Sequence, residues 1–217
     1  MSLEHYGIRV RQAEAGIPLD QLLDKERLTS IIRHYAQRIH TDDMTIAGSL
    51  FMKRYAVLTA AAAVYYYDLQ EEKMDWWTSA QFDAEHFTLL IDESISELVD
   101  DSWRARIFRE HLTPMLELIA KECKINERIL WENIAVRINS VFREYEHTMS
   151  SKLLDQTYSV LTSKPCNWLG REQNPFAASI HRTFNDKANP KRKTCCRYYQ
   201  ISTSTETPYC YVCPLWK

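Results

Sequence analysis

Glycine is scarce in this chain, with 4 among its 217 residues. Loops that hold a nucleotide phosphate against the backbone need several residues without a Cβ atom at short spacing. No G-x-G-x-x-G or Walker pattern can be written with Gly7, Gly16, Gly48 and Gly170. We therefore exclude a Rossmann domain or a P-loop, and we expect no FAD or NAD bound in the usual way.

Hydrophobic periodicity predicts a mainly helical protein. Apolar residues recur at steps of three and four from Pro18 to about His40 and from about Thr45 to Leu69. Helical spacing returns from Asp101, with Pro114 expected in a first turn after Thr113. The longest helix is predicted to begin at Asn126, as its cap, and to continue as far as Leu161.

Two regions depart from this helical pattern. Alternating Phe87, Leu89 and Ile91 indicate one or two strands or an irregular hairpin. From Lys164 onward prolines, asparagines and threonines replace periodic hydrophobics, apart from a predicted short helix around Ala177 to Phe184. We expect a helical body over residues 1–163, as the candidate chelate-binding part, and a C-terminal segment over 164–217 that is too small to fold on its own core.

No uninterrupted apolar run reaches the roughly 18 residues that a membrane helix needs. The opening MSLEHYGIRV has no basic segment leading into an apolar one, so it lacks the layout of a secretory signal. We therefore expect a cytoplasmic protein without a membrane span. In the reducing cytosol, clustered cysteines indicate a metal or redox site rather than structural disulfides.

Four of the six cysteines fall within twenty residues near the C-terminus: Cys195, Cys196, Cys210 and Cys213. The last two have the C-x-x-C spacing with which a turn presents two thiolates to one metal. Adjacent cysteines such as the first two rarely point both thiols at one tetrahedral ion, a demand that a cluster with two irons relaxes. The spacing alone leaves structural zinc, an iron-sulfur cluster and redox thiols open.

The cysteine segment is also basic. From residue 187 onward six Lys and Arg residues stand against Glu206 alone, in a chain whose net charge is −2. We expect four of them to surround the cysteines and to attract an anionic complex: Lys191, Arg192, Lys193 and Arg197. The alternative is that they only keep the segment soluble. No nucleic-acid module accompanies them, so we expect no nucleic-acid partner.

The motifs CCRYY and YCYVCPL resemble the cysteine pattern of the FhuF-type siderophore-iron reductases, which is C-C, a spacer of ten residues and C-x-x-C. LFMKRYA, ILWENIA and GREQNPF also look like pieces of that family's helical body. Here the spacer, Arg197 to Tyr209, has thirteen residues. The resemblance implies a [2Fe-2S] cluster held by Cys195, Cys196, Cys210 and Cys213.

It also implies a function: one-electron reduction of a ferric siderophore or ferric citrate, which releases ferrous iron because hard oxygen ligands hold the softer ferrous ion weakly. Electrons would come from a separate donor protein or reductant. Apart from the resemblance, Lys53, Arg54 and Tyr55 are candidates for a chelate groove in the helical body, although such cations usually face water. His181, just upstream of the cysteines, is a candidate for the surface beside them. The competing interpretations are a zinc-binding adaptor and an iron-sulfur redox sensor.

Overall fold

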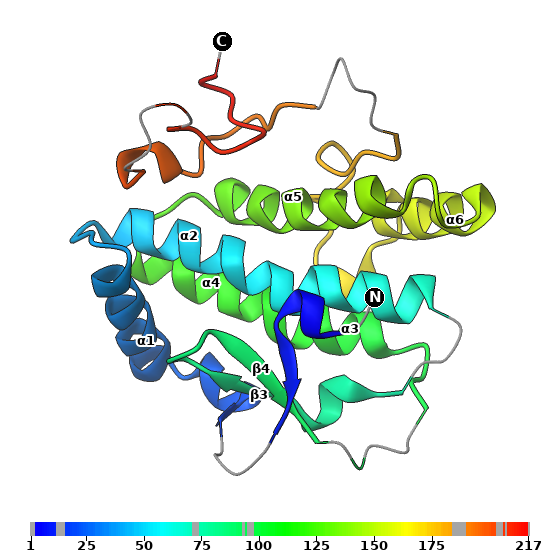
Figure 1. Cartoon of the computed structure of the whole chain (residues 1–217), viewed down its shortest axis with the longest axis horizontal. Helices are drawn as coiled ribbons and strands as arrows, with labels where there is room; N and C mark the ends of the chain where they lie inside the picture. The colour runs from blue at the N-terminus through cyan, green and yellow to red at the C-terminus, as the bar shows by residue number, and fades with distance from the viewer. Residues whose placement is uncertain are drawn as a thin grey trace.

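The computed structural model describes residues 3–11, 16–70, 74–92, 94, 98–183, 190–202, 206 and 208–216. It is mainly helical, with one small sheet (Figure 1). The α-helices are α1 (Lys25–Arg38), α2 (Met44–Ala56), α3 (Trp103–Ile107), α4 (Thr113–Glu122), α5 (Glu127–Tyr145) and α6 (Ser151–Thr162). Short 3-10 helices are η1 (Leu3–Tyr6), η2 (Leu19–Leu23), η5 (Trp76–Ser79), η7 (Asn167–Leu169) and η8 (Tyr198–Gln200). Three π-helical turns are η3 (Val57–Ala61), η4 (Val64–Asp68) and η6 (Phe108–Leu112).

Side-chain caps decide where the main helices begin. Asp24, Asp43 and Asn126 accept hydrogen bonds from the first free N–H groups of α1, α2 and α5. The cap on α5 is the one that the sequence predicts. Asp24 corrects the first helix: residues 19–23 form a separate 3-10 turn, and the α-helix begins only after the cap.

The second predicted helix is confirmed, because α2 continues through η3 and η4 to Leu69. Its run of alanines is buried, and so are Tyr65 and Tyr67, as expected of a packed core. Pro114 lies in the first turn of α4, as predicted.

Two helices differ from expectation. The helix after Asn126 ends at Tyr145 and α6 begins anew after its Ser150 cap, while residues 175–179 form a turn and no helix runs through the described residues up to Thr183.

The sheet contains the predicted hairpin of β3 (Gln81–Asp83) and β4 (Thr88–Ile91). Two further strands, β1 (Ile8–Val10) and β2 (Ile17–Pro18), were not predicted, because two or three residues are too few for an alternating pattern. The strand order is β1-β4-β3-β2, with β1 parallel to β4 and the other pairs antiparallel. The pleat sends Ile8, Phe82 and Leu89 into the core.

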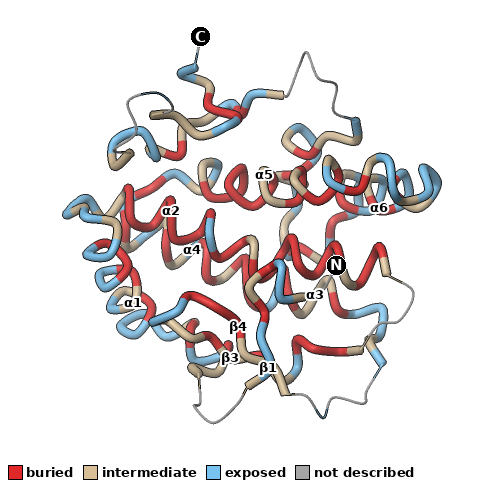
Figure 2. Tube along the Cα trace, in the orientation of Figure 1, coloured by how far each residue is buried: buried red, intermediate tan, exposed pale blue. Residues whose placement is uncertain are grey.

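The core lies among α2, α4, α5 and the sheet (Figure 2). Leu130, Ile134 and Ile138 on α5 are fully buried, which is the apolar face expected from their spacing. Leu169 and Phe176, from beyond α6, join the same core. In Figure 1 the C-terminal segment, residues 190–216 where described, lies along α5 on the side away from the sheet.

Candidate metal and ligand site

The last part of the chain, residues 190–216 where described, contains only the short η8 helix, so contacts with the body must hold it in place. Glu132, buried on α5, accepts hydrogen bonds from the backbone N–H groups of Lys193 and Thr194, the latter at 2.8 Å. Arg192 is 4% exposed and lies 3.6 Å from the same carboxylate. Because a buried charge is tolerated only when it is paired, this ion pair positions the chain just before the first cysteines.

Neighbouring side chains extend this attachment. Asn133 accepts from the Arg192 Nη1 at 2.7 Å and donates to the Ser49 carbonyl on α2 at 2.8 Å. The Ser49 hydroxyl in turn donates to the carbonyl of Cys196 at 3.0 Å. Two helices of the body and the cysteine segment are therefore joined by one buried polar network.

Two of the C-terminal cysteines, Cys196 and Cys210, come into contact beside this network, and Cys195 and Cys213 are near enough to interact with them electrostatically. The sulfurs of Cys196 and Cys210 lie 3.6 Å apart. Burial raises the pKa of Cys195, and Cys196 and Cys213 raise it further by their charge. Cys213 likewise contributes to the raised pKa of Cys210. The fold thus brings together Cys196 and Cys210, which lie fourteen positions apart in the sequence.

The Cys196 sulfur lies in a cationic environment. The hydrogen bond with Cys210 and the ammonium of Lys53 lower the pKa of Cys196, and the same hydrogen bond raises that of Cys210. Lys53 on α2 is buried and donates to the Cys196 sulfur at 3.4 Å. Burial lowers the pKa of Arg137, on α5, and the thiols of Cys196 and Cys210 oppose that effect. This environment stabilises the thiolate of Cys196, the form in which cysteine binds metals.

The geometry can be compared with that of a metal centre. Two thiolates on one tetrahedral ion, each at about 2.3 Å from it, are about 3.8 Å apart. The 3.6 Å between Cys196 and Cys210 is close to that value. Within the described residues no three His, Cys, Asp or Glu side chains converge on a single ion position. The close pair is therefore compatible with two thiolates that share one metal ion.

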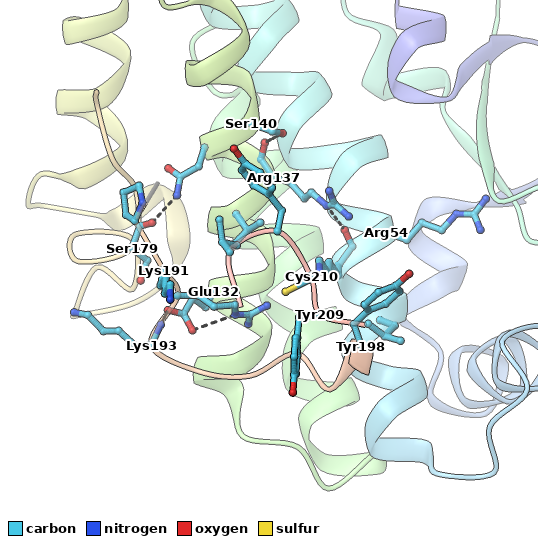
Figure 3. Close-up of a pocket in the computed structure, with 18 of the residues that line it drawn as sticks. Arg54, Glu132, Arg137, Ser140, Ser179, Lys191, Lys193, Tyr198, Tyr209 and Cys210 are labelled. Carbon is cyan, nitrogen blue, oxygen red and sulfur yellow. Dashed lines mark hydrogen bonds and ion pairs between the residues drawn. The ribbon is translucent and has the colours of Figure 1, made fainter. Parts of the chain in front are cut away.

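Cys210 also forms part of the wall of a cavity of about 580 Å³. Its other walls come from α1, α2 and α5, from residues 178–181 and from residues 190–212 (Figure 3). Lys53 and Arg54, expected in a chelate groove, and His181, expected beside the cysteines, all line this cavity. Tyr55 does not, because it is fully buried and hydrogen-bonded to His111 at 2.7 Å.

The four cations predicted around the cysteines lie in different environments. Lys191, Arg192 and Lys193 line the cavity, with Arg192 buried in its ion pair, Lys191 donating to the Trp216 carbonyl and Lys193 exposed. Arg197 lies outside the lining and is 3.6 Å from Asp43. Their role toward a ligand stays a prediction.

Sequence reasoning missed Glu132, Asn133, Ser49 and Arg137. A signal for two of them was present: Glu132 and Asn133 interrupt the apolar run of ILWENIA in the middle of a helix. Adjacent polar residues inside such a run, flanked by Trp131 and Ile134, indicate a buried polar contact with another segment. The partner segment could not be identified from sequence.

Comparison with known proteins adds one family. The family described as ferric iron reductase FhuF-like transporter matches residues 59–192, more than half of the chain. None of the curated proteins compared with the chain matches it. No helix in the described residues is long and apolar enough to cross a membrane.

The match includes ILWENIA and GREQNPF and stops at Arg192, just before the four cysteines. It therefore covers all of α5, including Glu132, Asn133 and Arg137, which contact the cysteine segment or line the cavity. The chain belongs to the FhuF-like ferric iron reductase family.

Proposed function

We propose that this protein is a cytoplasmic siderophore-iron reductase that binds a [2Fe-2S] cluster through Cys195, Cys196, Cys210 and Cys213. The observation that carries the proposal is the position of Cys210, which is paired with Cys196 and also lines the large cavity. A ferric chelate in that cavity would lie against one of the ligands of the cluster. When bound, the cluster supplies one electron at a time.

The reaction needs no bond to the protein. Ferric iron in the chelate gains one electron and becomes ferrous, and the oxygen-rich chelator then holds it weakly. A separate electron-carrier protein restores the electron. The chain's own residues hold the thiolates, exclude water from one side of them and surround them with positive charge from Lys53 and Arg137. That charge favours the reduced, more negative state of the centre.

The proposal can be tested on anaerobically purified full-length protein. We expect a coloured protein with two irons and two acid-labile sulfides per chain, whose visible spectrum bleaches with dithionite and recovers on addition of ferric citrate. The rate of recovery must exceed that of dithionite-reduced free cluster under the same conditions. A colourless protein with one zinc, and no cluster after reconstitution, would refute the reductase and favour the zinc-binding adaptor.

A further inference from the structure

The cavity beside Cys210 is far more positively charged than the protein as a whole, whose net charge is −2. Among the described residues that line it, the only carboxylate is Glu132, and seven side chains are cationic: Lys53, Arg54, Arg137, Arg143, Lys191, Arg192 and Lys193. A concave surface lined by one sign of charge attracts ligands of the opposite sign. The imbalance is therefore a property of this site rather than of the composition.

The carboxylate of Glu132 does not offset this charge, because it is already engaged. It accepts hydrogen bonds from the backbone of Lys193 and Thr194 and pairs with Arg192. When Glu132 and Arg192 are counted as neutralising each other, the other six cations still leave the cavity positively charged.

Three of the helix cations, Lys53, Arg54 and Arg137, have no acidic partner in the part of the chain that the structure describes. Lys53 contacts the Cys196 sulfur, and the Arg54 guanidinium lies 4.5 Å from the centre of the Phe87 ring. Arg137 donates its Nε–H to the Lys53 carbonyl at 3.1 Å. That bond uses one of the five guanidinium N–H groups and holds the side chain in place. The terminal amino groups can then donate to a ligand in the parallel geometry that suits a carboxylate.

Neutral hydrogen-bonding groups complete the lining. Tyr35, Tyr198 and Tyr209 bring phenol groups to the cavity, and Ser140 brings a hydroxyl. Figure 3 shows Arg137, Tyr209 and Cys210 on the same cavity. At about 580 Å³ the cavity has the size of a small-molecule pocket, for which about 300–1,000 Å³ is usual.

We infer that this cavity binds a ferric chelate of net negative charge with free carboxylate groups, that Arg137 is its main carboxylate-binding residue, and that Lys193 adds positive charge at its exposed side. The inference rests on the proposed function and specifies its substrate class. Chelates that are neutral or positive once iron is bound, such as simple hydroxamates, gain nothing from the cations. They also leave the cations without a counter-charge in a partly closed site.

Binding can be measured apart from electron transfer by using gallium(III), a redox-inert substitute for ferric iron. Titration calorimetry of the holoprotein with gallium(III) citrate should show binding that weakens as salt is added. The positively charged gallium(III) complex of desferrioxamine B should bind at least about tenfold more weakly, the factor that corresponds to about 1.4 kcal/mol. Equal affinity for the two chelates would overturn the inference.

Three variants sharpen the binding test. Arg137→Gln removes the charge and retains an N–H donor for the Lys53 carbonyl. Lys193→Glu reverses the charge of an exposed side chain and keeps the backbone N–H that Glu132 accepts from. Each should weaken gallium(III) citrate binding by about tenfold or more, the worth of a charge-assisted hydrogen bond. Arg33→Glu is the control: it makes the same charge reversal as Lys193→Glu at an exposed position of α1 outside the lining, and it should leave the affinity for gallium(III) citrate unchanged. Unchanged affinity in both Arg137→Gln and Lys193→Glu would refute the assignment.

Reoxidation of the dithionite-reduced protein separates this inference from the proposed function. Faster reoxidation by ferric citrate than by ferric desferrioxamine B, with the difference reduced in Arg137→Gln, supports both. Equal rates with the two chelates overturn the substrate class and leave the reductase standing. If neither chelate reoxidises the protein, the proposed function fails, and the substrate class fails with it.

Discussion

The helical body and the C-terminal segment are held together by different forces. In the body, α2, α4, α5 and the sheet bury a continuous apolar core that includes Phe51, Leu130 and Phe142. In the C-terminal segment the described buried residues include two cysteines, Val212 and the ion-paired Arg192. Its position depends on the polar network around Glu132 and, when bound, on the cluster. The body should therefore fold without metal, whereas the segment should not stay in place without its polar anchors.

The largest effect that this contrast predicts is loss of the cluster without loss of the body. Cys196→Ser and Cys210→Ser should each remove nearly all bound iron and sulfide, because each takes a thiolate from the close pair. Far-ultraviolet circular dichroism should stay that of the wild type. Cys123→Ala, at a buried cysteine of the body, is the matched control and should retain the cluster. Unfolding of the body in the serine variants would contradict the contrast.

A second, smaller effect concerns Glu132, the buried carboxylate that pairs with Arg192 and holds the C-terminal segment to α5. Glu132→Gln should lower the free energy that attaches residues 190–202 by about 3–5 kcal/mol, since the change leaves Arg192 charged and buried without its carboxylate. Backbone amide exchange at Lys193 and Thr194 should accelerate accordingly, while exchange in the core of α2 changes little.

Glu117→Gln provides the control for that experiment. Glu117 pairs with Arg171 at 2.7 Å, but it is 52% exposed, so its loss should cost about 1 kcal/mol or less. Equal effects of the two substitutions would show that the segment is not held by the buried pair.

Acid should weaken the body through a group that the cluster does not touch. Burial lowers the pKa of His111 to about 3, against about 6.5 in the unfolded chain. As the pH falls, the unfolded chain takes up a proton on this histidine before the folded protein does, and this favours unfolding. The contribution of His111 to the free energy of unfolding is therefore complete above about pH 6.5 and declines as the pH falls toward 3. Urea unfolding should give about 2 kcal/mol less stability at pH 5 than at pH 7.5 from this group.

His111→Gln separates that contribution from general acid effects. It should unfold more easily at neutral pH, because the site loses packing and the bond with Tyr55, and its stability should depend less on pH. His34→Gln, at an exposed position of α1, should retain the wild-type profile. An unaltered pH profile in His111→Gln would refute the assignment.

The smallest predicted effect is that of a residue of the body on the midpoint potential of the cluster in the C-terminal segment. Lys53 belongs to α2 but donates to the Cys196 sulfur. Lys53→Met should lower the midpoint potential of the bound cluster by about 60 mV, equivalent to about 1.4 kcal/mol for one electron, because a positive charge next to the thiolate stabilises the reduced state. Lys53→Arg keeps the charge and should stay closer to the wild type. Redox titration followed in the visible spectrum distinguishes the two, and equal potentials in all three proteins would show that the body does not tune the centre.

Local patterns were sufficient for much of the body. The Asn126 cap, the buried face of α5, the hairpin at Phe87 to Ile91 and the place of Pro114 all follow from interactions within a few residues. The wrong helix boundaries lie where tertiary packing overrides a continuous apolar periodicity. Apolar periodicity continues past Tyr145, but the chain turns there and starts α6 at a new cap, so that both helices reach the core.

The sequence by itself determined the helical class, the exclusion of nucleotide-phosphate loops and the grouping of four cysteines near the C-terminus. These follow from residue type and short-range spacing. Only the tertiary structure decided what surrounds the cysteines: Lys53 lies 143 positions before Cys196, and Glu132 lies 62 positions before Thr194. Local sequence spacing does not predict contacts between residues so far apart in the chain. The packing of whole helices decides which side chain pairs with a buried charge.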